Sequence, residues 1–306
     1  MRSTECAQET IQMINGINLL FQLLDSFAFI VLAAIGLAVI FGMMGVINLA
    51  HGELIMIGAY GTVLSANAGL PLALAMGVGV LSAAVAGFVI ERTVIKRLYH
   101  RPLDSMVATW ALAIALVQIV RIIFGNSLSG IGMPFGSIEF GAFSYSAYRT
   151  LLALVALIVL LGVYLIFTRT EFGVRARATI QDADTARAMG VDTDRMYTST
   201  FVIGSALAGL TGALYAPAMA IVPGMGSSFL VEAFVAVVTG GTAVLLGTTL
   251  AAGTLGTVDA LFTNVYGTFI GQVMMLIAAI MILRFLPTGL SGFVSNLREN
   301  IKYDTQ

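Results

Sequence analysis

The chain has 306 residues, of which 58% are hydrophobic and only 10% charged, and its mean hydropathy is +0.97. A soluble domain carries about 25% charged residues, so this composition indicates a protein embedded in a lipid bilayer. The net charge of −1 argues against nucleic acid as a partner, and the single cysteine, Cys6, cannot form an internal disulfide.

Long apolar segments follow one another along almost the whole chain. They cover residues 19–41, 42–66, 71–90, 104–124, 150–167, 198–219, 229–247, 243–264 and 268–286. Apart from a polar stretch inside 42–66, these runs are continuously apolar, whereas the strands of a membrane barrel alternate in polarity, so the segments are expected to be helices. We therefore predict an all-α polytopic membrane bundle of about nine spans (about eight to ten), forming a single transmembrane domain over residues 1–306.

The basic residues predict the orientation of these spans. Of the 15 Lys and Arg residues, 12 lie in three regions, at 92–101, in the loop at 168–196 and from Arg284 to Lys302. The positive-inside rule places these regions in the cytoplasm. The N-terminus is then expected outside the cell membrane, and nine crossings bring the C-terminus inside.

The stretch GVINLAHGELIMIGAYG at 45–61 interrupts an apolar segment with polar residues. Asn48 can cap a half-helix that starts between Leu49 and Gly52, and Glu53 then lies in its first turn at the positive end of the dipole, with His51 beside it. Buried carboxylates in membranes usually serve a function. Asn48, His51 and Glu53 are therefore candidates for a translocation path. Alternatively, they only form hydrogen bonds with each other and with the backbone groups that the break leaves unpaired.

A second interrupted segment, FLVEAFVAVVTGG, occupies residues 229–241. It predicts a short span that ends at Gly240 and Gly241, followed by a separate helix. Paired broken helices in the two halves of a chain are typical of transporter substrate paths, so Glu232 and Thr239 join the two glycines as candidates. The alternative for this group is close helix packing through small residues.

The chain carries no motif for chemistry of its own. Its only lysines, Lys96 and Lys302, do not form the Gly-Lys-Ser/Thr of a phosphate-binding loop, and His51 and His100 lie in different segments, too far apart for a zinc peptidase motif. A serine hydrolase is disfavoured because Ser205 has no histidine near it in sequence. We expect no enzyme activity, no metal and no cofactor, which leaves a passive channel or a pump driven by partners.

The cytoplasmic loop at 168–196 carries five acidic residues and five arginines. The part from Arg175 to Met189 lacks Gly and Pro and is rich in Ala, which predicts a short helix that ends at Gly190. Such a helix, with small residues edged by charge, suits docking into the groove of a soluble partner. The alternative is a solvated loop with internal ion pairs.

Several stretches resemble one known family, the permease subunits of ATP-binding cassette importers for branched-chain amino acids and their relatives that import urea and short amides. The matching stretches are GVINLAHGELIMIGAY at 45–60, IERTVIKRLYHRPLDSMVATW at 90–110, residues 169–212, VEAFVAVVTGG at 231–241 and FLPTGLSG at 285–292. The stretch at 98–125 looks closer to the urea and amide importers. Residues 240–248 depart from the family pattern.

The resemblance implies that DTARAMG at 184–190 is the coupling helix, with Asp184 and Thr185 in place of the family's Glu and Ala. The implied ATPase-coupling residues are Glu171, Gly173, Arg175, Arg177, Asp184, Thr185, Ala186 and Gly190. The implied partners are a second homologous permease subunit, two ATP-binding subunits and a soluble substrate-binding protein, assembled in the bacterial inner membrane. A self-sufficient channel for a small neutral solute such as urea is the alternative function.

Overall fold

The computed structural model describes residues 2–99, 101–140, 143–241 and 244–293. These residues form a helix bundle with one small antiparallel hairpin, in which Ser137 pairs with Ser146. The principal elements are α1 (Arg2–Met44), α2 (His51–Asn67), α3 (Leu72–Thr93), α4 (Pro102–Phe124), β1 (Ser137–Phe140), β2 (Phe143–Ser146), α5 (Ala147–Arg169), α6 (Glu171–Gln181), α7 (Ala183–Ala188), α8 (Thr193–Tyr215), α9 (Gly226–Gly240), α10 (Val244–Tyr266) and α11 (Thr268–Phe285). The predicted all-α bundle is confirmed; Arg298 and Lys302 lie outside the described residues.

Seven of the described helices are long and apolar enough to cross a bilayer, namely α1, α3, α4, α5, α8, α10 and α11. Two shorter helices, α2 and α9, have 17 and 15 residues. At about 1.5 Å per residue they are about 25 and 22 Å long, shorter than the hydrocarbon core of about 30 Å. These are the two interrupted segments that the sequence predicts.

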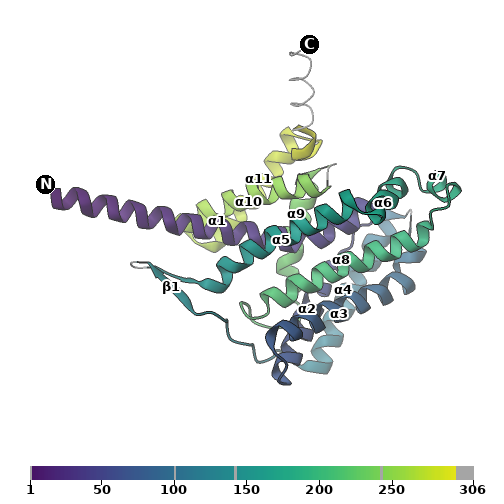
Figure 1. Ribbon diagram of the computed structural model, residues 1–306, viewed down its shortest axis with the longest axis horizontal. Coiled ribbons are helices and arrows are strands. Elements are labelled where there is room, and N and C mark those ends of the chain that lie inside the picture. Colours follow the sequence, from purple (N-terminus) through teal and green to yellow (C-terminus); the bar gives the residue numbers. More distant parts are fainter. Residues whose placement is uncertain (1, 100, 141–142, 242–243, 294–306) are drawn as a thin grey trace, which may run out of the picture.

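Helix α1 runs through the middle of the bundle (Figure 1), where it contacts α5, α8, α9 and α10. Helices α2, α3 and α4 lie on one side of it, and α10 and α11 lie on the other. The short helices α6 and α7 lie at the end of the bundle opposite the hairpin and the start of α1. Lys96, in the 3-10 turn Ile95–Arg97, pairs with Asp194 of α8 at 3.0 Å, so two of the three basic regions meet at this end.

Small residues set the close packing of α2, α3 and α8. A methyl group on Gly58 would overlap the backbone of Gly209, and one on Gly209 would overlap Ala83 of α3. Helices in a bilayer gain little from burying apolar surface against each other, so contact between backbones is a main source of their association.

Several helix boundaries differ from the expected ones, and two of the differences stand out. Helix α1 begins at Arg2 instead of residue 19, and α8 ends at Tyr215 instead of residue 219. Residues 216–225 are not helical, and this segment contains Pro217 and Pro223, which remove backbone donors.

Candidate functional site

The first break separates α1 from α2 over residues 45–50. Asn48 Oδ1 accepts a hydrogen bond from the Ala50 amide at 3.0 Å, and the Leu49 amide donates to Thr109 Oγ1 of α4 at 3.1 Å. Ala50 occupies the N-cap position of α2, which has no side-chain cap. Asn48 therefore stabilises the turn that precedes the helix, whereas the sequence suggested that it caps the helix itself.

His51 is fully buried and holds α2 against α1. Its Nε2 atom lies 3.0 Å from the carbonyl oxygen of Ala33. Since a carbonyl can only accept, Nε2 carries the proton. One residue away on α1, the carbonyl of Leu32 accepts a hydrogen bond from Thr211 Oγ1 of α8 at 2.7 Å. Together these two bonds attach α2 and α8 to consecutive peptide units of α1.

Glu53 lies in the first turn of α2 and is 6% exposed. The ion pairs among the described residues do not include it. The start of α9 meets this turn, because a methyl group on Gly226 would overlap the backbone of Gly52 and lie 3.0 Å from the Glu53 amide nitrogen. The positive ends of two helix dipoles thus converge beside a carboxylate, which favours negative charge there.

Three polar atoms in this turn are buried without a hydrogen-bond partner in the described part of the chain. They are Asn48 Nδ2, His51 Nδ1 and Glu53 Oε2. Each unsatisfied buried group costs about 1–3 kcal/mol, so three within six residues need an explanation. Their unmet hydrogen-bonding capacity makes this turn the candidate site.

The second break separates α9 from α10. Gly240 ends α9 and packs closely on Gly247, since an added methyl would lie 2.6 Å from the Gly247 carbonyl carbon. Thr239 Oγ1 donates to the Val235 carbonyl of its own helix at 2.7 Å, and Glu232 shares a side-chain hydrogen bond with Gln272 of α11. The residues at the second break therefore pack closely through glycine, and the Thr239 and Glu232 side chains have partners of their own. This arrangement agrees with the alternative of close helix packing through small residues.

The segment at 168–196 forms two short helices before α8, so the prediction of one helix from Arg175 to Met189 is wrong. Asp182 separates them in an extended conformation, and its Oδ1 accepts from the amides of Asp184 and Thr185, both at 3.0 Å. A side chain that bonds to nearby amides in this way competes with the helix and starts a new one. Hydrogen bonds from the Thr185 hydroxyl and amide lower the pKa of Asp182, so it remains ionised at neutral pH.

Helix α7 presents charge outward and a small residue inward. Asp184 is exposed and pairs with Arg187 at 3.3 Å, while Ala186 is 1% exposed. Arg187 also donates to Thr193 Oγ1 at the start of α8, at 2.7 Å. Gly190 follows the helix with φ +90°, a conformation that suits glycine, and this agrees with its predicted capping role.

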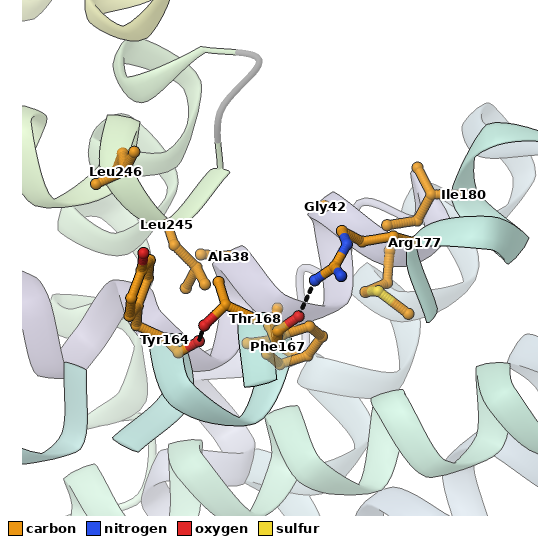
Figure 2. Close-up of a pocket in the computed structure, with 11 residues that line it drawn as sticks. Ala38, Gly42, Tyr164, Phe167, Thr168, Arg177, Ile180, Leu245 and Leu246 are labelled. Carbon is orange, nitrogen blue, oxygen red and sulfur yellow. Dashed lines mark hydrogen bonds between the residues drawn. The ribbon is translucent and has the colours of Figure 1, made fainter. Parts of the chain in front are cut away.

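The other predicted coupling residues lie on α6. Glu171 and Arg175 form an exposed ion pair at 2.9 Å, and Gly173 packs directly on the backbone of Phe167. Arg177 is exposed, and its guanidinium donates a hydrogen bond to the carbonyl of Phe167, as Figure 2 shows. It lies at the edge of a mostly apolar cavity of about 410 Å³ between α1, α5, α6 and α10. Arg177 therefore ties α6 to the end of α5.

A second cavity, of about 560 Å³, connects these parts. Its lining includes Gly45 at the first break, Gly241 at the second, and Asp182 and Ala183 at the joint between α6 and α7. The segments that the sequence proposed separately as path and coupling device thus border one space at the end of the bundle that holds α7.

Glu91, in the last turn of α3, is a buried carboxylate that the sequence analysis missed. It is fully buried and accepts a hydrogen bond from the hydroxyl of Tyr99, whose ring lies 4.9 Å from that of Tyr197 on α8. Burial, together with the bond to Glu91, raises the pKa of Tyr99 far above its usual range, so Tyr99 remains a donor. The sequence did hold a signal for this buried residue, namely a single carboxylate at the end of an apolar helix.

A family model described as the permease component of branched-chain amino acid transport systems matches residues 19–285. The chain belongs to this family. The resemblance of its motifs is thereby confirmed, and the chain is a multi-pass membrane transport permease.

This permease is similar to BraD of Pseudomonas aeruginosa, a high-affinity branched-chain amino acid transport system permease protein, with 29% identity over 283 residues that cover 85% of this chain and 91% of BraD. It is also similar to the Escherichia coli permease protein of the same description, LivH, with 27% identity over 298 residues covering 92% and 94% of the two chains. A probable LivH of Methanocaldococcus jannaschii is 27% identical over 280 residues, covering 86% and 88%. No solved structure matches the chain.

Proposed function

We propose that this chain is the permease subunit of an ATP-driven importer and forms the path for a small polar solute. Amino acids with apolar side chains are the leading substrate class, because the relatives are described as permeases of branched-chain amino acid transport systems. One observation supports the mechanism most directly, namely that both helix breaks and the α6–α7 joint border the same cavity.

The energy comes from outside the chain in this proposal. Two ATP-binding subunits bind and hydrolyse ATP, since the sequence holds no phosphate-binding loop. A soluble binding protein delivers the solute, and a second homologous permease completes the path as a heterodimer in the inner membrane. The N-terminus lies outside and the C-terminus in the cytoplasm.

The occluded part of the path lies where α2 and α9 meet. Asn48, His51 and Glu53 hold unsatisfied polar atoms there, and broken helices in transporters direct their N-termini at substrate groups in the same way. His51 also has a structural role through Ala33, and Thr239 and Gly240 act through packing.

Transport follows alternating access. Closure of the ATPase pair pushes α7, whose exposed Asp184 and Thr185 face the partner and whose Arg187 is bonded to the start of α8. The push reaches α5 through Arg177 and reaches the cavity through Asp182. The cavity then opens or closes beneath the two breaks, which shifts the population between two states.

The test is uptake into proteoliposomes that contain the full complex of two permeases, two ATPases and the binding protein. Leucine and urea serve as alternative solutes, and a complex with a hydrolysis-deficient ATPase serves as the control. We expect ATP-dependent leucine uptake. Equally fast uptake by the chain alone, without ATP, would contradict the proposal and favour a self-sufficient channel.

A further inference from the structure

The cavity beside Arg177 lies between α1, α5, α6 and α10 and has a volume of about 410 Å³ (Figure 2). This volume is within the range of about 300–1,000 Å³ that is typical of ligand pockets. Apolar side chains make up most of the lining, and none of the described residues that line it is acidic. Phe167 is buried in its wall, whereas Tyr164, Ile180 and Leu246 are 41%, 47% and 63% exposed. The cavity therefore opens onto the outer surface of the bundle.

The outer surface around this cavity is apolar along two spans. Both α5 and α10 are long and apolar enough to cross a bilayer, and the exposed Leu165 and Leu250 continue the surface along them. In a membrane, such a surface contacts lipid chains. Helix α5 ends at Arg169, and the lining residues Phe167 and Thr168 belong to its last turn. The cavity thus lies near the headgroups of one leaflet, which is the cytoplasmic leaflet in the proposed orientation.

Arg177 provides a cation at the edge of the cavity that no carboxylate neutralises. Its guanidinium has five N–H donors and donates to the carbonyl of Phe167. The side chain is exposed, and the ion pairs among the described residues include neither Arg177 nor the nearby Arg169, whereas Arg175 pairs with Glu171. A phosphate group accepts two parallel N–H bonds from a guanidinium. The edge of the cavity therefore suits an anion, while its interior suits an apolar chain.

We propose that this cavity binds an anionic phospholipid, with one acyl chain inside the cavity and the phosphate on Arg177. Cytoplasmic leaflets carry such lipids, and basic pockets between transmembrane helices on that side bind their headgroups. A zwitterionic phospholipid carries a cation that opposes the attraction of Arg177. A free amino acid would leave its ammonium group without an acidic partner among the described residues that line the cavity.

The bound lipid contacts two segments that move in the proposed mechanism. It touches the coupling segment through Arg177 and Ile180, and it touches the start of α10, after the second break, through Leu245 and Leu246. A ligand that binds one arrangement of these segments more tightly shifts the population toward that arrangement. The site thus makes the bundle sensitive to the lipid composition of the membrane, which goes beyond the proposed function.

The test measures labelling of the cavity by lipid in the full complex, reconstituted into vesicles. Phosphatidylglycerol and phosphatidylcholine that carry the same photoactivatable diazirine in one acyl chain are compared at equal amounts, and mass spectrometry locates the labelled residues. Phosphatidylglycerol, the anionic lipid, is expected to label residues 38–43 and 245–246 several-fold more strongly than phosphatidylcholine. The middle of α4 is the internal control, because Ile114 and Ile119 are exposed and do not line the cavity. Both lipids are expected to label it alike.

Competitors distinguish between the possible occupants. An excess of unlabelled phosphatidylglycerol is expected to remove the preferential labelling, whereas inorganic phosphate and leucine leave it unchanged. Displacement by inorganic phosphate would assign Arg177 to a free anion, and displacement by leucine would assign the cavity to the solute path. Either result overturns the proposal, and so does equal labelling by the two lipids or an absence of label in the cavity.

Substitutions provide a second arm. Arg177→Gln is expected to reduce labelling by phosphatidylglycerol to the level of phosphatidylcholine, whereas Arg177→Lys keeps the charge and most of the labelling. Arg97→Gln is the matched control, because Arg97 is exposed at the end of the 3-10 turn and does not line the cavity. Undiminished labelling in Arg177→Gln contradicts the assigned role. The lipid and competitor series use the wild-type chain, so they decide the matter even where a variant fails to fold.

Labelling needs neither ATP nor solute, which separates this inference from the proposed function. If the complex imports leucine and the two lipids label the cavity alike, the lipid site is wrong and the importer stands. If phosphatidylglycerol labels the cavity as expected and ATP drives no uptake, the proposed function is overturned and the lipid site stands.

Discussion

Gly52 of α2 and Gly226 of α9 lie against each other through their backbones, so the first turns of the two short helices meet without any side chain between them. We predict that Gly52→Ala forces these turns apart and lowers the free energy of unfolding by about 1–3 kcal/mol, as overpacking of a close contact does. Thermal unfolding of the purified permease measures the change.

Gly77→Ala is the matched control, because Gly77 lies within α3 and a methyl group there meets nothing within 4 Å. That change is expected to leave stability unchanged or to raise it by up to about 1 kcal/mol, since alanine favours the helix. Equal melting temperatures for Gly52→Ala and the wild type would show that the two helices tolerate separation.

Glu53→Gln keeps the size of the side chain and removes its charge. We expect uptake to fall while stability is kept or rises, because the cost of burying a carboxylate without a counter-ion among the described residues exceeds what the two helix dipoles return. Uptake into proteoliposomes and thermal unfolding test this, with Glu139→Gln on an exposed strand as the control. Wild-type uptake by Glu53→Gln would leave Glu53 with no place in the path.

Thr211→Val removes the hydrogen bond from α8 to the Leu32 carbonyl while keeping the shape of the side chain. The expected loss is about 0.6–1 kcal/mol, the usual worth of one interhelical hydrogen bond in a membrane protein. Thr257→Val controls for the substitution itself, because Thr257 is exposed and bonds only within α10, to Gly253. If both variants unfold alike, the α1–α8 bond contributes nothing measurable.

Ala186→Leu places a larger side chain at the buried face of α7. We expect ATP hydrolysis to continue while uptake falls several-fold, because the helix no longer seats on the bundle and cannot transmit the push. The ratio of solute imported to ATP hydrolysed is the measurement. Ala188→Leu, on the exposed face, should keep the wild-type ratio.

Gly190→Pro is expected to uncouple in the same way as Ala186→Leu. Proline fixes φ near −65°, whereas Gly190 has φ +90°, and proline removes the amide that donates to Arg187. Membrane insertion, measured as the yield of folded protein, should be unchanged because Gly190 lies outside the candidate membrane spans. Normal coupling in this variant would argue against a docking role for α7.

The sequence alone predicted most of the architecture. Apolar segment lengths predicted the helices, and the polar residues near Gly45 and the glycines at 240–241 marked both breaks, because backbone groups freed by a break inside a membrane need polar partners or a close backbone neighbour. The hairpin at 137–146 and the division at Asp182 were missed. Asp182 acts through its side chain, which composition averages do not detect.

The contacts between segments could not be predicted. Local sequence patterns do not indicate the contact between Gly52 and Gly226 or the ion pair between Asp25 and Arg149. Each joins residues more than a hundred positions apart. The hydrogen bond between His51 and Ala33 was equally hidden, because its acceptor is a backbone carbonyl that any residue provides.

Amide hydrogen exchange at the break before α2 can report the opening of the cavity beside it. Residues 46–50 lie outside regular helix, next to Gly45, which lines the cavity of about 560 Å³. The amides of Leu49 and Ala50 donate to Thr109 and Asn48, so their hydrogens exchange with deuterium only when these bonds open and water reaches the break. Exchange at these few positions, followed by mass spectrometry through the ATP cycle, would therefore report when the inner side stands open, without any label attached to the protein.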